Sequence, residues 1–321
     1  MSASRARVAR RPVHGVLLLD KPRGLSSNDA LQKAKWLLRA EKAGHTGTLD
    51  PLATGVLPLC FGAATKFSQL HLDADKTYEA VAVLGVKTST GDAEGQVLSE
   101  RPVPAITPDR LRELERRFTG RLRQVPPMHS ALKKDGKALY EYARQGEEVD
   151  REAREVTIHA LAIAACEEAG RPALRFSTRV SKGTYIRTLG EDLGEALGCG
   201  AHLSALRRTA TGPFDLAQCI TLQELEALPE EERAERLLPP ESLVAGHTPV
   251  TLGTEDAGRF LSGLRRRGAW PDSESAAVFG RDPHAFLGTG RVRAGELIPV
   301  RLLSPAEIEQ ILRAKERATT P

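Results

Sequence analysis

Residues 44–55 read GHTGTLDPLATG, a segment in which glycines bracket a single carboxylate, Asp50. Pro51 disfavours the helical conformation for Asp50 and favours an extended one. The flanking glycines let the backbone turn tightly or approach another molecule closely. Two interpretations follow from this segment alone: an Asp-Pro turn between two core elements, or a carboxylate held in place for chemistry. The choice between them depends on the rest of the chain.

Length and composition indicate a soluble globular protein. The chain has 321 residues, of which 40% are hydrophobic and 27% are charged. This length fits one large domain or two unequal ones, and we expect two. No apolar run approaches membrane-spanning length. The first residues are rich in arginine but lack the apolar region of a secretory signal. We therefore expect a cytoplasmic protein that does not bind a membrane, with a basic flexible arm over residues 1–12.

The distribution of positive charge favours a large anionic partner. The formal net charge is only +4, but basic side chains cluster at four places, namely residues 112–123, 133–137, 207–208 and 265–267. Each cluster alone also fits a solvated face. Four spaced clusters fit a polyanion such as nucleic acid better than a small acidic metabolite.

The sequence contains no pattern typical of a metal site. Its cysteines, Cys60, Cys166, Cys199 and Cys219, are far apart, and its eight histidines form no cluster with ligand spacing. We expect the cysteines to be buried, reduced thiols. A dinucleotide-binding motif is also missing, so the sequence predicts neither a metal nor a cofactor.

The hydrophobic pattern predicts an α+β fold. Strands are expected at residues 13–19, 56–61, 77–86, 155–165 and 172–180, and helices at 27–39, 63–72, 107–118 and 186–197. A turn is expected at residues 20–24. Alternation over 77–86 places Tyr78 on the same face as apolar residues. The turn at 181–184 leads into a helix start, where unpaired N–H groups could meet a phosphate or carboxylate.

Three further segments complete the predicted organisation. Residues 124–154 are basic, contain several prolines and glycines, and are predicted to form an insertion. An acidic helical segment over 221–241 leads to a domain boundary near residue 244. The remainder is predicted to be a small β-barrel-like module because its short β-like stretches are separated by glycine and proline.

Five ordered motifs resemble the TruB family of bacterial tRNA pseudouridine synthases. They are GVLLLDKP at residues 15–22, the 44–55 segment, ATKF at 64–67, PMHSALK at 127–133 and SKGTYIRTL at 181–189. The resemblance implies a catalytic domain over residues 13–243, with a mixed, mainly antiparallel sheet flanked by helices. It also implies a PUA-like RNA-binding domain over residues 244–321. The implied activity is isomerisation of uridine 55 in the T arm of tRNA. We expect the protein to act as a monomer, without metal or cofactor.

The same resemblance assigns roles to individual residues. It implies that Asp50 is catalytic, with Tyr78 in the active site and Arg187 paired with the aspartate. Substrate-binding positions are His45, Tyr185, Leu206 and Lys21. Four side chains of the basic clusters are separate candidates for contacts with the RNA backbone, namely Lys133, Lys134, Arg207 and Arg208. At His129 the sequence departs from the family, in which many members carry tyrosine.

The chemistry of pseudouridine formation fits this set. The bond from ribose to uracil N1 breaks, the base turns, and C5 joins the ribose, without net oxidation or hydrolysis. An ionised Asp50 could attack or assist an elimination, and an arginine beside it is expected to lower its pKa. Tyr78 either stacks on the flipped uracil and relays the C5 proton or packs as an ordinary strand residue.

Two other function classes stay open: an RNA-folding factor, alone or alongside catalysis, and an N-glycosidase.

Overall fold

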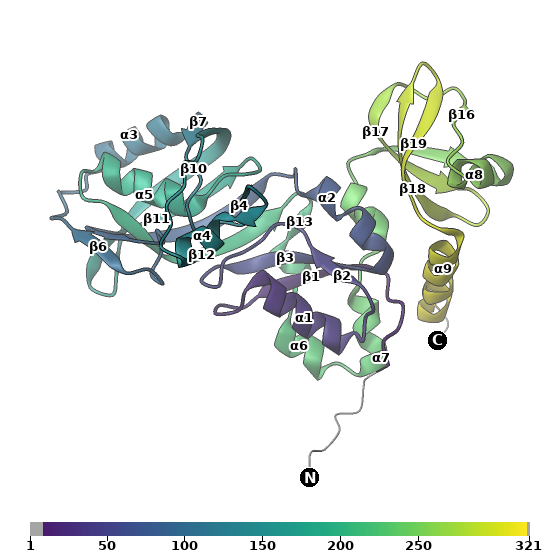
Figure 1. The fold of residues 1–321 in the computed structure, drawn as a ribbon, viewed down its shortest axis with the longest axis horizontal. Coiled ribbons are helices and arrows are strands. Elements are labelled where there is room, and N and C mark those ends of the chain that lie inside the picture. The colour runs from purple at the N-terminus through teal and green to yellow at the C-terminus, as the bar shows by residue number, and fades with distance from the viewer. Residues whose placement is uncertain (1–8, 320–321) are drawn as a thin grey trace, which may run out of the picture.

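The structure of the chain, a computed structural model, describes residues 9–319. A large sheet with flanking helices forms the first part of the molecule, and a smaller β-rich module follows it (Figure 1). The predicted basic arm lies largely outside the described residues. Within the described part of that arm, Arg11 already forms backbone hydrogen bonds with Arg39 and Glu41.

The central sheet is mixed and mainly antiparallel, as predicted. Its strands run in the order β14 (Ile220–Thr221), β1 (Gly15–Lys21), β3 (Thr54–Phe61), β12 (Ala201–Thr211), β4 (Lys76–Leu84), β11 (Arg171–Val180), β10 (Arg154–Glu168) and β7 (Gly120–Gln124). β2 (Ala43–His45) pairs with β3, and β13 (Phe214–Asp215) pairs with β12. Only the β1–β14 and β3–β12 pairs are parallel among the described strands of this sheet.

The β3–β12 pair determines where the 44–55 segment lies. Gly55 is opposite Arg208 in this pair, and β12 pairs on its other edge with β4. A Cβ atom on Gly55 would lie 2.1 Å from the Arg208 carbonyl oxygen, and its φ of +101° is in the left-handed region. Glycine therefore allows the close approach that brings the loop beside β4.

One expected turn begins later than the sequence pattern suggested. Asp20 and Lys21 were expected in a turn, but both belong to β1, where Lys21 pairs with Gly55. The side chain of Lys21 is fully buried. The ladder with β3 overrides the local turn signal because it satisfies the backbone groups of these residues.

Two of the predicted helices begin at a residue whose side chain caps them. α1 (Ser27–Leu37) has Ser26 as its N-cap in a capping box with Asp29, and α3 (Pro108–Phe118) is capped by Thr107. α5 (Ile186–Ala196) buries Leu189 and Leu193. The shorter helices of this part are α2 (Ser68–His71), α4 (Leu139–Arg144), α6 (Leu222–Ala227) and α7 (Glu230–Arg233), with a 3₁₀ turn at Gly62–Lys66.

Segment 124–154 contains little regular structure. It holds a two-stranded ribbon, β8 (Lys133–Lys134) with β9 (Lys137–Ala138), followed by α4. A second ribbon pairs β5 (Val86–Thr88) with β6 (Val97–Glu100). Cys60 and Cys199 are buried as expected, whereas Cys166 and Cys219 are only partly buried; all four are free.

The C-terminal module is a five-stranded sheet with helices. Its strands run in the order β15 (Thr248–Leu252), β17 (Ser273–Gly280), β18 (Ala285–Arg293), β19 (Glu296–Leu302) and β16 (Arg266–Arg267). The sequence pattern indicated its β character but missed α8 (Thr254–Leu261) and α9 (Pro305–Thr319). Among residues 9–319, no helix is long and apolar enough to cross a membrane.

One apolar cluster joins the module to the large sheet. Val16 and Phe67 from the first part share it with Phe286 and Leu303 from the module. The rings of Phe67 and Phe286 are 5.1 Å apart, and Lys66 pairs with Glu307 at 2.6 Å. The two parts are therefore packed together rather than only tethered.

Candidate active site

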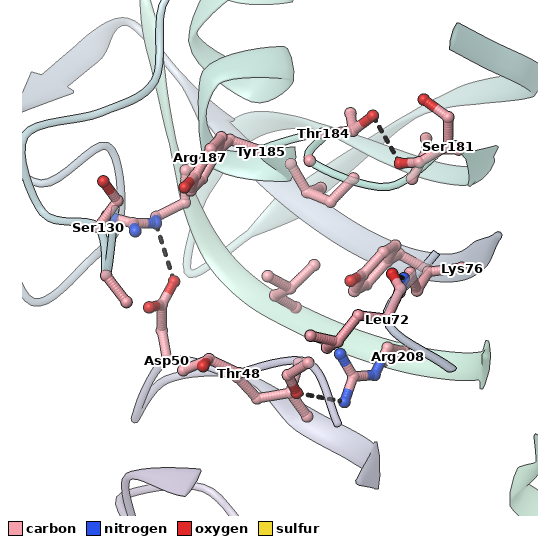
Figure 2. A pocket seen from close by; sticks show the side chains of 18 of the residues that line it. Thr48, Asp50, Leu72, Lys76, Ser130, Ser181, Thr184, Tyr185, Arg187 and Arg208 are labelled. Atoms are coloured by element: carbon pink, nitrogen blue, oxygen red, sulfur yellow. Dashed lines mark hydrogen bonds and ion pairs between the residues drawn. The ribbon is translucent and has the colours of Figure 1, made fainter. Parts of the chain in front are cut away.

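A cavity of about 340 Å³ opens at the end of the 44–55 loop. Its wall combines that loop, β4, β12, residues 130–132 and the turn before α5. Figure 2 shows Asp50 and Arg187 pointing toward one another at one side of it. The predicted residues that line it are Asp50, Tyr78, Tyr185, Arg187, Leu206 and Arg208. Residues from distant parts of the sequence thus meet at one place.

Asp50 and Arg187 form an ion pair. The Nε atom of Arg187 lies 3.0 Å from Oδ2 of Asp50. The side chain of Asp50 is 38% exposed, whereas that of Arg187 is 5% exposed. The carboxylate therefore faces the cavity, and the guanidinium lies behind it in the protein.

Three other groups hold the guanidinium of Arg187. Nη1 donates to the carbonyl of Thr90 at 2.8 Å, and Nη2 donates to the carbonyl of His129 at 2.6 Å. The buried carboxylate of Asp92 lies 3.9 Å from Nε. These contacts fix the plane of the guanidinium, so only the side that meets Asp50 faces the cavity. Sequence reasoning did not find Thr90 or Asp92, because nothing local marks them as partners of Arg187.

Burial and charge act in opposite directions on Asp50. Burial raises the pKa of Asp50, the Arg187 guanidinium lowers it, and the neighbouring Asp92 raises it again. The net shift is upward. Arg187 therefore lowers the pKa of Asp50, as expected, but the loss of hydration around this carboxyl group outweighs the effect of the arginine.

The backbone of the loop is held from several sides. Ser27 Oγ donates to the Leu49 carbonyl at 3.0 Å and accepts from the Leu49 N–H at 2.7 Å. Gly24 N–H donates to the Pro51 carbonyl, and Ala53 N–H donates to the Asp50 carbonyl. The two interpretations of the segment are compatible, because the backbone of Asp50 forms a turn while its side chain faces the cavity.

Two tyrosines and a leucine supply the less polar surface of the cavity. Tyr78 lies on the inward face of β4, as the alternation predicted, and Leu206 lies on β12; each is 8% exposed. Tyr185 is the N-cap of α5. Its N–H donates to the side chain of Gln124 and its carbonyl accepts from the same amide. The N–H of Tyr185, one of the groups at this helix start, is therefore already paired within the protein.

Arg208 does not present a surface charge. Its side chain is 1% exposed, and Nε and Nη2 donate to the carbonyls of Val56 and Gly47. The expectation that it contacts an RNA backbone at the surface is wrong, because alternation along β12 turns Arg208 inward with Leu206. Its neighbour Arg207 forms a two-pronged pair with Asp20, at 3.0 and 2.7 Å.

The remaining predicted residues lie outside the cavity lining. Lys21 is fully buried, donates to the carbonyls of Pro22 and Leu25 in the turn after β1, and does not line the cavity. His45 ends β2 and is half-buried. Lys133 is exposed on β8, and Lys134 donates to the Asp150 carbonyl.

The cavity also contains residues that sequence reasoning missed. Lys76, Leu72 and Ser130 line it, together with Gly47 and Thr48 of the loop. Lys76 could have been found, because it precedes Tyr78 by two residues and shares its face of the strand. Within residues 9–319, no group of three or more His, Cys, Asp or Glu side chains is placed to hold a metal ion.

Two family models cover the parts of the chain that build this cavity. The TruB family pseudouridylate synthase N-terminal domain matches residues 35–186, and the tRNA pseudouridylate synthase B C-terminal domain matches residues 187–245. The chain belongs to the TruB family. As a TruB-family pseudouridylate synthase it is an isomerase, which confirms the predicted family and enzyme class. The matched TruB region ends before β15, so the PUA-like character of the C-terminal module stays a prediction.

Curated relatives of the TruB family are similar along nearly the whole chain. The tRNA pseudouridine synthase B of Verminephrobacter eiseniae is 65% identical, over 98% of this chain and 96% of the relative. That of Ralstonia nicotianae is 58% identical, over 94% of this chain and 98% of the relative.

Solved structures show the same fold. A chain in a Cbf5–Nop10–Gar1 complex matches with a TM-score of 0.68 and 26% identity, over 91% of this chain and 84% of that chain. A chain in an archaeal box H/ACA sRNP Nop10–Cbf5 complex matches with a TM-score of 0.66 and 23% identity, over 91% of this chain and 86% of that chain. These similarities confirm the predicted α+β pseudouridine synthase fold.

Proposed function

We propose that the chain isomerises uridine 55 in the T arm of tRNA to pseudouridine, acting as a monomer in the cytoplasm. The observation that carries the proposal is the Asp50 carboxylate, which is paired with Arg187 at 3.0 Å and open to a cavity. The relatives at 65% and 58% identity are named tRNA pseudouridine synthase B, which supports tRNA as the substrate.

Asp50 is proposed to carry the bond rearrangement. As a carboxylate it can add to the substrate as a nucleophile or assist loss of the base by elimination. Both routes start from the ionised form. Arg187 favours that form against the desolvation that raises the pKa of Asp50, and its three other contacts keep the pair in place.

The shape of the cavity suits a single flipped nucleotide. Its volume of about 340 Å³ is at the small end of ligand sites. Tyr78 is proposed to stack on uracil and to relay the C5 proton, with Tyr185 and Leu206 completing the pocket. A uridine inside a folded loop must leave its stack to enter, which costs a few kcal/mol. His45 is proposed to occupy space near the displaced bases.

Segment 124–154 is proposed to close over the RNA. Ser130, Ala131 and Leu132 already form one wall of the cavity. Lys133 is exposed beside that wall, and Lys134 is less exposed. A phosphate chain entering the cavity would pass these lysines, which offsets part of the cost of base flipping.

Nucleotide-resolution mapping of pseudouridine in full tRNA and in a T-arm stem-loop tests the proposal. We expect modification at position 55 by the native chain and none by Asp50→Asn, which should keep its fold and its RNA affinity. Asp109→Asn is a matched control because Asp109 is 89% exposed on α3. Modification at another position would refute the site assignment, and near-native activity of Asp50→Asn would refute the role of Asp50.

The same samples separate the two competing functions. Release of free uracil instead of isomerisation would identify an N-glycosidase. An RNA-folding role that is independent of catalysis predicts that Asp50→Asn still assists tRNA folding. If folding assistance disappears together with catalysis, an independent folding role is excluded.

A further inference from the structure

The cavity has a second charged end, opposite the Asp50–Arg187 pair. Lys76 and Arg208 lie there, across the cavity from Asp50 in Figure 2. Lys76 is 9% exposed and Arg208 is 1% exposed. Such burial of two cations near each other opposes folding, because both lose hydration and they repel. The mechanism above assigns neither of them a role.

The ammonium group of Lys76 is fixed in position. Its Nζ donates to the carbonyls of Leu72 at 2.6 Å and Ala74 at 2.5 Å. An ammonium carries three N–H donors, so one is left for the cavity that Lys76 lines. Burial and the nearby Arg208 lower the pKa of Lys76 to about 8. The side chain is therefore still mostly protonated at neutral pH.

Arg208 contacts the loop that carries Asp50, because its Nη2 donates to the Gly47 carbonyl at 3.1 Å, and Lys76 lies close to the same residue. A Cβ atom on Gly47 would lie 3.2 Å from Nη1 of Arg208 and 4.0 Å from Cε of Lys76. Gly47 is three residues before Asp50. The positive end thus lies beside the reacting loop, within reach of the base that Asp50 would address.

Pseudouridine formation creates a negative charge that needs such a partner. When the N1–C1′ bond breaks, both electrons stay with uracil, and the negative charge spreads over N1, C5 and the two carbonyl oxygens. The base then turns, C5 bonds to C1′, C5 loses its proton and N1 gains one. A fixed cation in a site of low hydration stabilises such a developing charge more than water does.

We propose that Lys76, supported by Arg208, stabilises the negative charge on the uracil ring while it is detached from the ribose. This inference rests on the proposed function of the Asp50 cavity. Lys76 is then a catalytic residue that contacts the base, and Arg208 is a positioning residue that adds positive potential and holds Gly47. The hydrogen bond from Lys76 can stabilise the uracil anion both when the N1–C1′ bond breaks and while the base turns, because either carbonyl oxygen of uracil can accept it.

Single-turnover kinetics on T-arm RNA carrying uridine or 5-fluorouridine at the target test this role. Lys76→Met should lower the rate of N1–C1′ cleavage about 100-fold on uridine, the loss typical of removing one charge-stabilising donor, with RNA affinity unchanged. Lys76→Arg should recover part of the rate. Fluorine at C5 makes uracil a better leaving group, so the loss caused by Lys76→Met should be smaller on the fluorinated RNA.

Lys182→Met is the matched control. Lys182 is another lysine close to Lys76, but it is 61% exposed, pairs with Asp73 at 2.8 Å, and lies outside the cavity lining. Its replacement should leave the cleavage rate unchanged on both RNAs. If Lys76→Met does not fold, Lys76→Gln, which can still donate to the carbonyls of Leu72 and Ala74, takes its place.

Three results would overturn the inference. An equal loss on both RNAs would show that Lys76 does not act on the leaving group. A change confined to RNA affinity would make Lys76 a phosphate contact. An unchanged rate would leave it a structural residue. The proposed function has its own test, which is that the native chain modifies the uridine RNA and Asp50→Asn does not. Any of the three results above could occur while that test succeeds, so failure of the Lys76 inference is distinguishable from failure of the proposed function.

Discussion

The carbonyl oxygen of His129 accepts a hydrogen bond of 2.6 Å from Nη2 of Arg187, the arginine that also contacts Asp50. His129 belongs to segment 124–154, whereas Arg187 lies in the first turn of α5. The position of the segment is therefore linked to the ion pair at the cavity. The contact uses the backbone of residue 129, so it does not depend on the side chain at this position.

Replacing Arg187 should affect both stability and turnover. Arg187→Ala leaves Asp50 and the buried Asp92 without their partner, and we expect a loss of about 3 kcal/mol in the free energy of unfolding. This loss is at the low end of the range expected for breaking a buried ion pair, because 38% of the Asp50 side chain is exposed. Denaturant unfolding and pseudouridine formation measure the two effects. Arg175→Ala, at an exposed position of β11, should change stability by less than about 0.5 kcal/mol; equal losses in both variants would contradict the role of the pair.

The acid side of the pH–rate profile should report on Asp50. The pKa of Asp50 is raised above that of a free aspartate. As the pH falls, Asp50 should therefore lose its charge at a higher pH than a free aspartate does, and the reaction rate should fall with it. Asp92 is one cause of that rise. Asp92→Asn removes this negative charge, lowers the pKa of Asp50, and should move the acid limb to lower pH. Single-turnover rates across the acidic range check this, and a limb that does not move would show that another group titrates.

Two adjacent serines allow a controlled test of the loop. Ser27→Ala removes both hydrogen bonds to Leu49 and leaves a buried N–H unpaired, which should cost about 1–3 kcal/mol and lower turnover. Ser26→Ala should cost about 1 kcal/mol through the lost cap of α1, without affecting turnover. Hydrogen exchange of residues 46–53 should rise only in Ser27→Ala. Equal rates of catalysis in the two variants would exclude the proposed support of the loop.

The parallel contact between β3 and β12 should tolerate no side chain at Gly55. Gly55→Ala puts a methyl group 2.1 Å from the Arg208 carbonyl at a φ of +101°, and we expect a loss above about 2 kcal/mol. Gly44→Ala meets no atom within 4 Å and has no left-handed φ, so it should be close to neutral. Thermal unfolding of both variants measures the difference. A stable Gly55→Ala variant would mean that the two strands can separate at this point.

The sequence predicted the parts of the site that follow from local rules. Pro51 and the glycines restricted the conformation of Asp50, and alternation placed Tyr78 inside. The same alternation, applied to Lys76 and to Arg208, would have placed both of them in the cavity as well. The run of two arginines at 207–208 instead suggested a surface patch.

Long-range pairing was beyond such rules. Asp92 and the carbonyls of Thr90 and His129 meet Arg187 from segments 58 to 97 residues away in the chain. Nothing in their local sequence indicates a partner. The net rise of the Asp50 pKa was missed for a related reason, since it depends on how much protein surrounds the carboxyl group.

The apolar cluster shared by Val16, Phe67, Phe286 and Leu303 holds the C-terminal module in a fixed position relative to the cavity. Packing, rather than a flexible tether, sets the separation between the cavity and the arginines at 291, 293 and 301 on β18 and β19. A molecule that touches both places must match that separation with its own rigid shape. An RNA in contact with both places would have to hold them at this distance, which a folded RNA does and a flexible single strand does not.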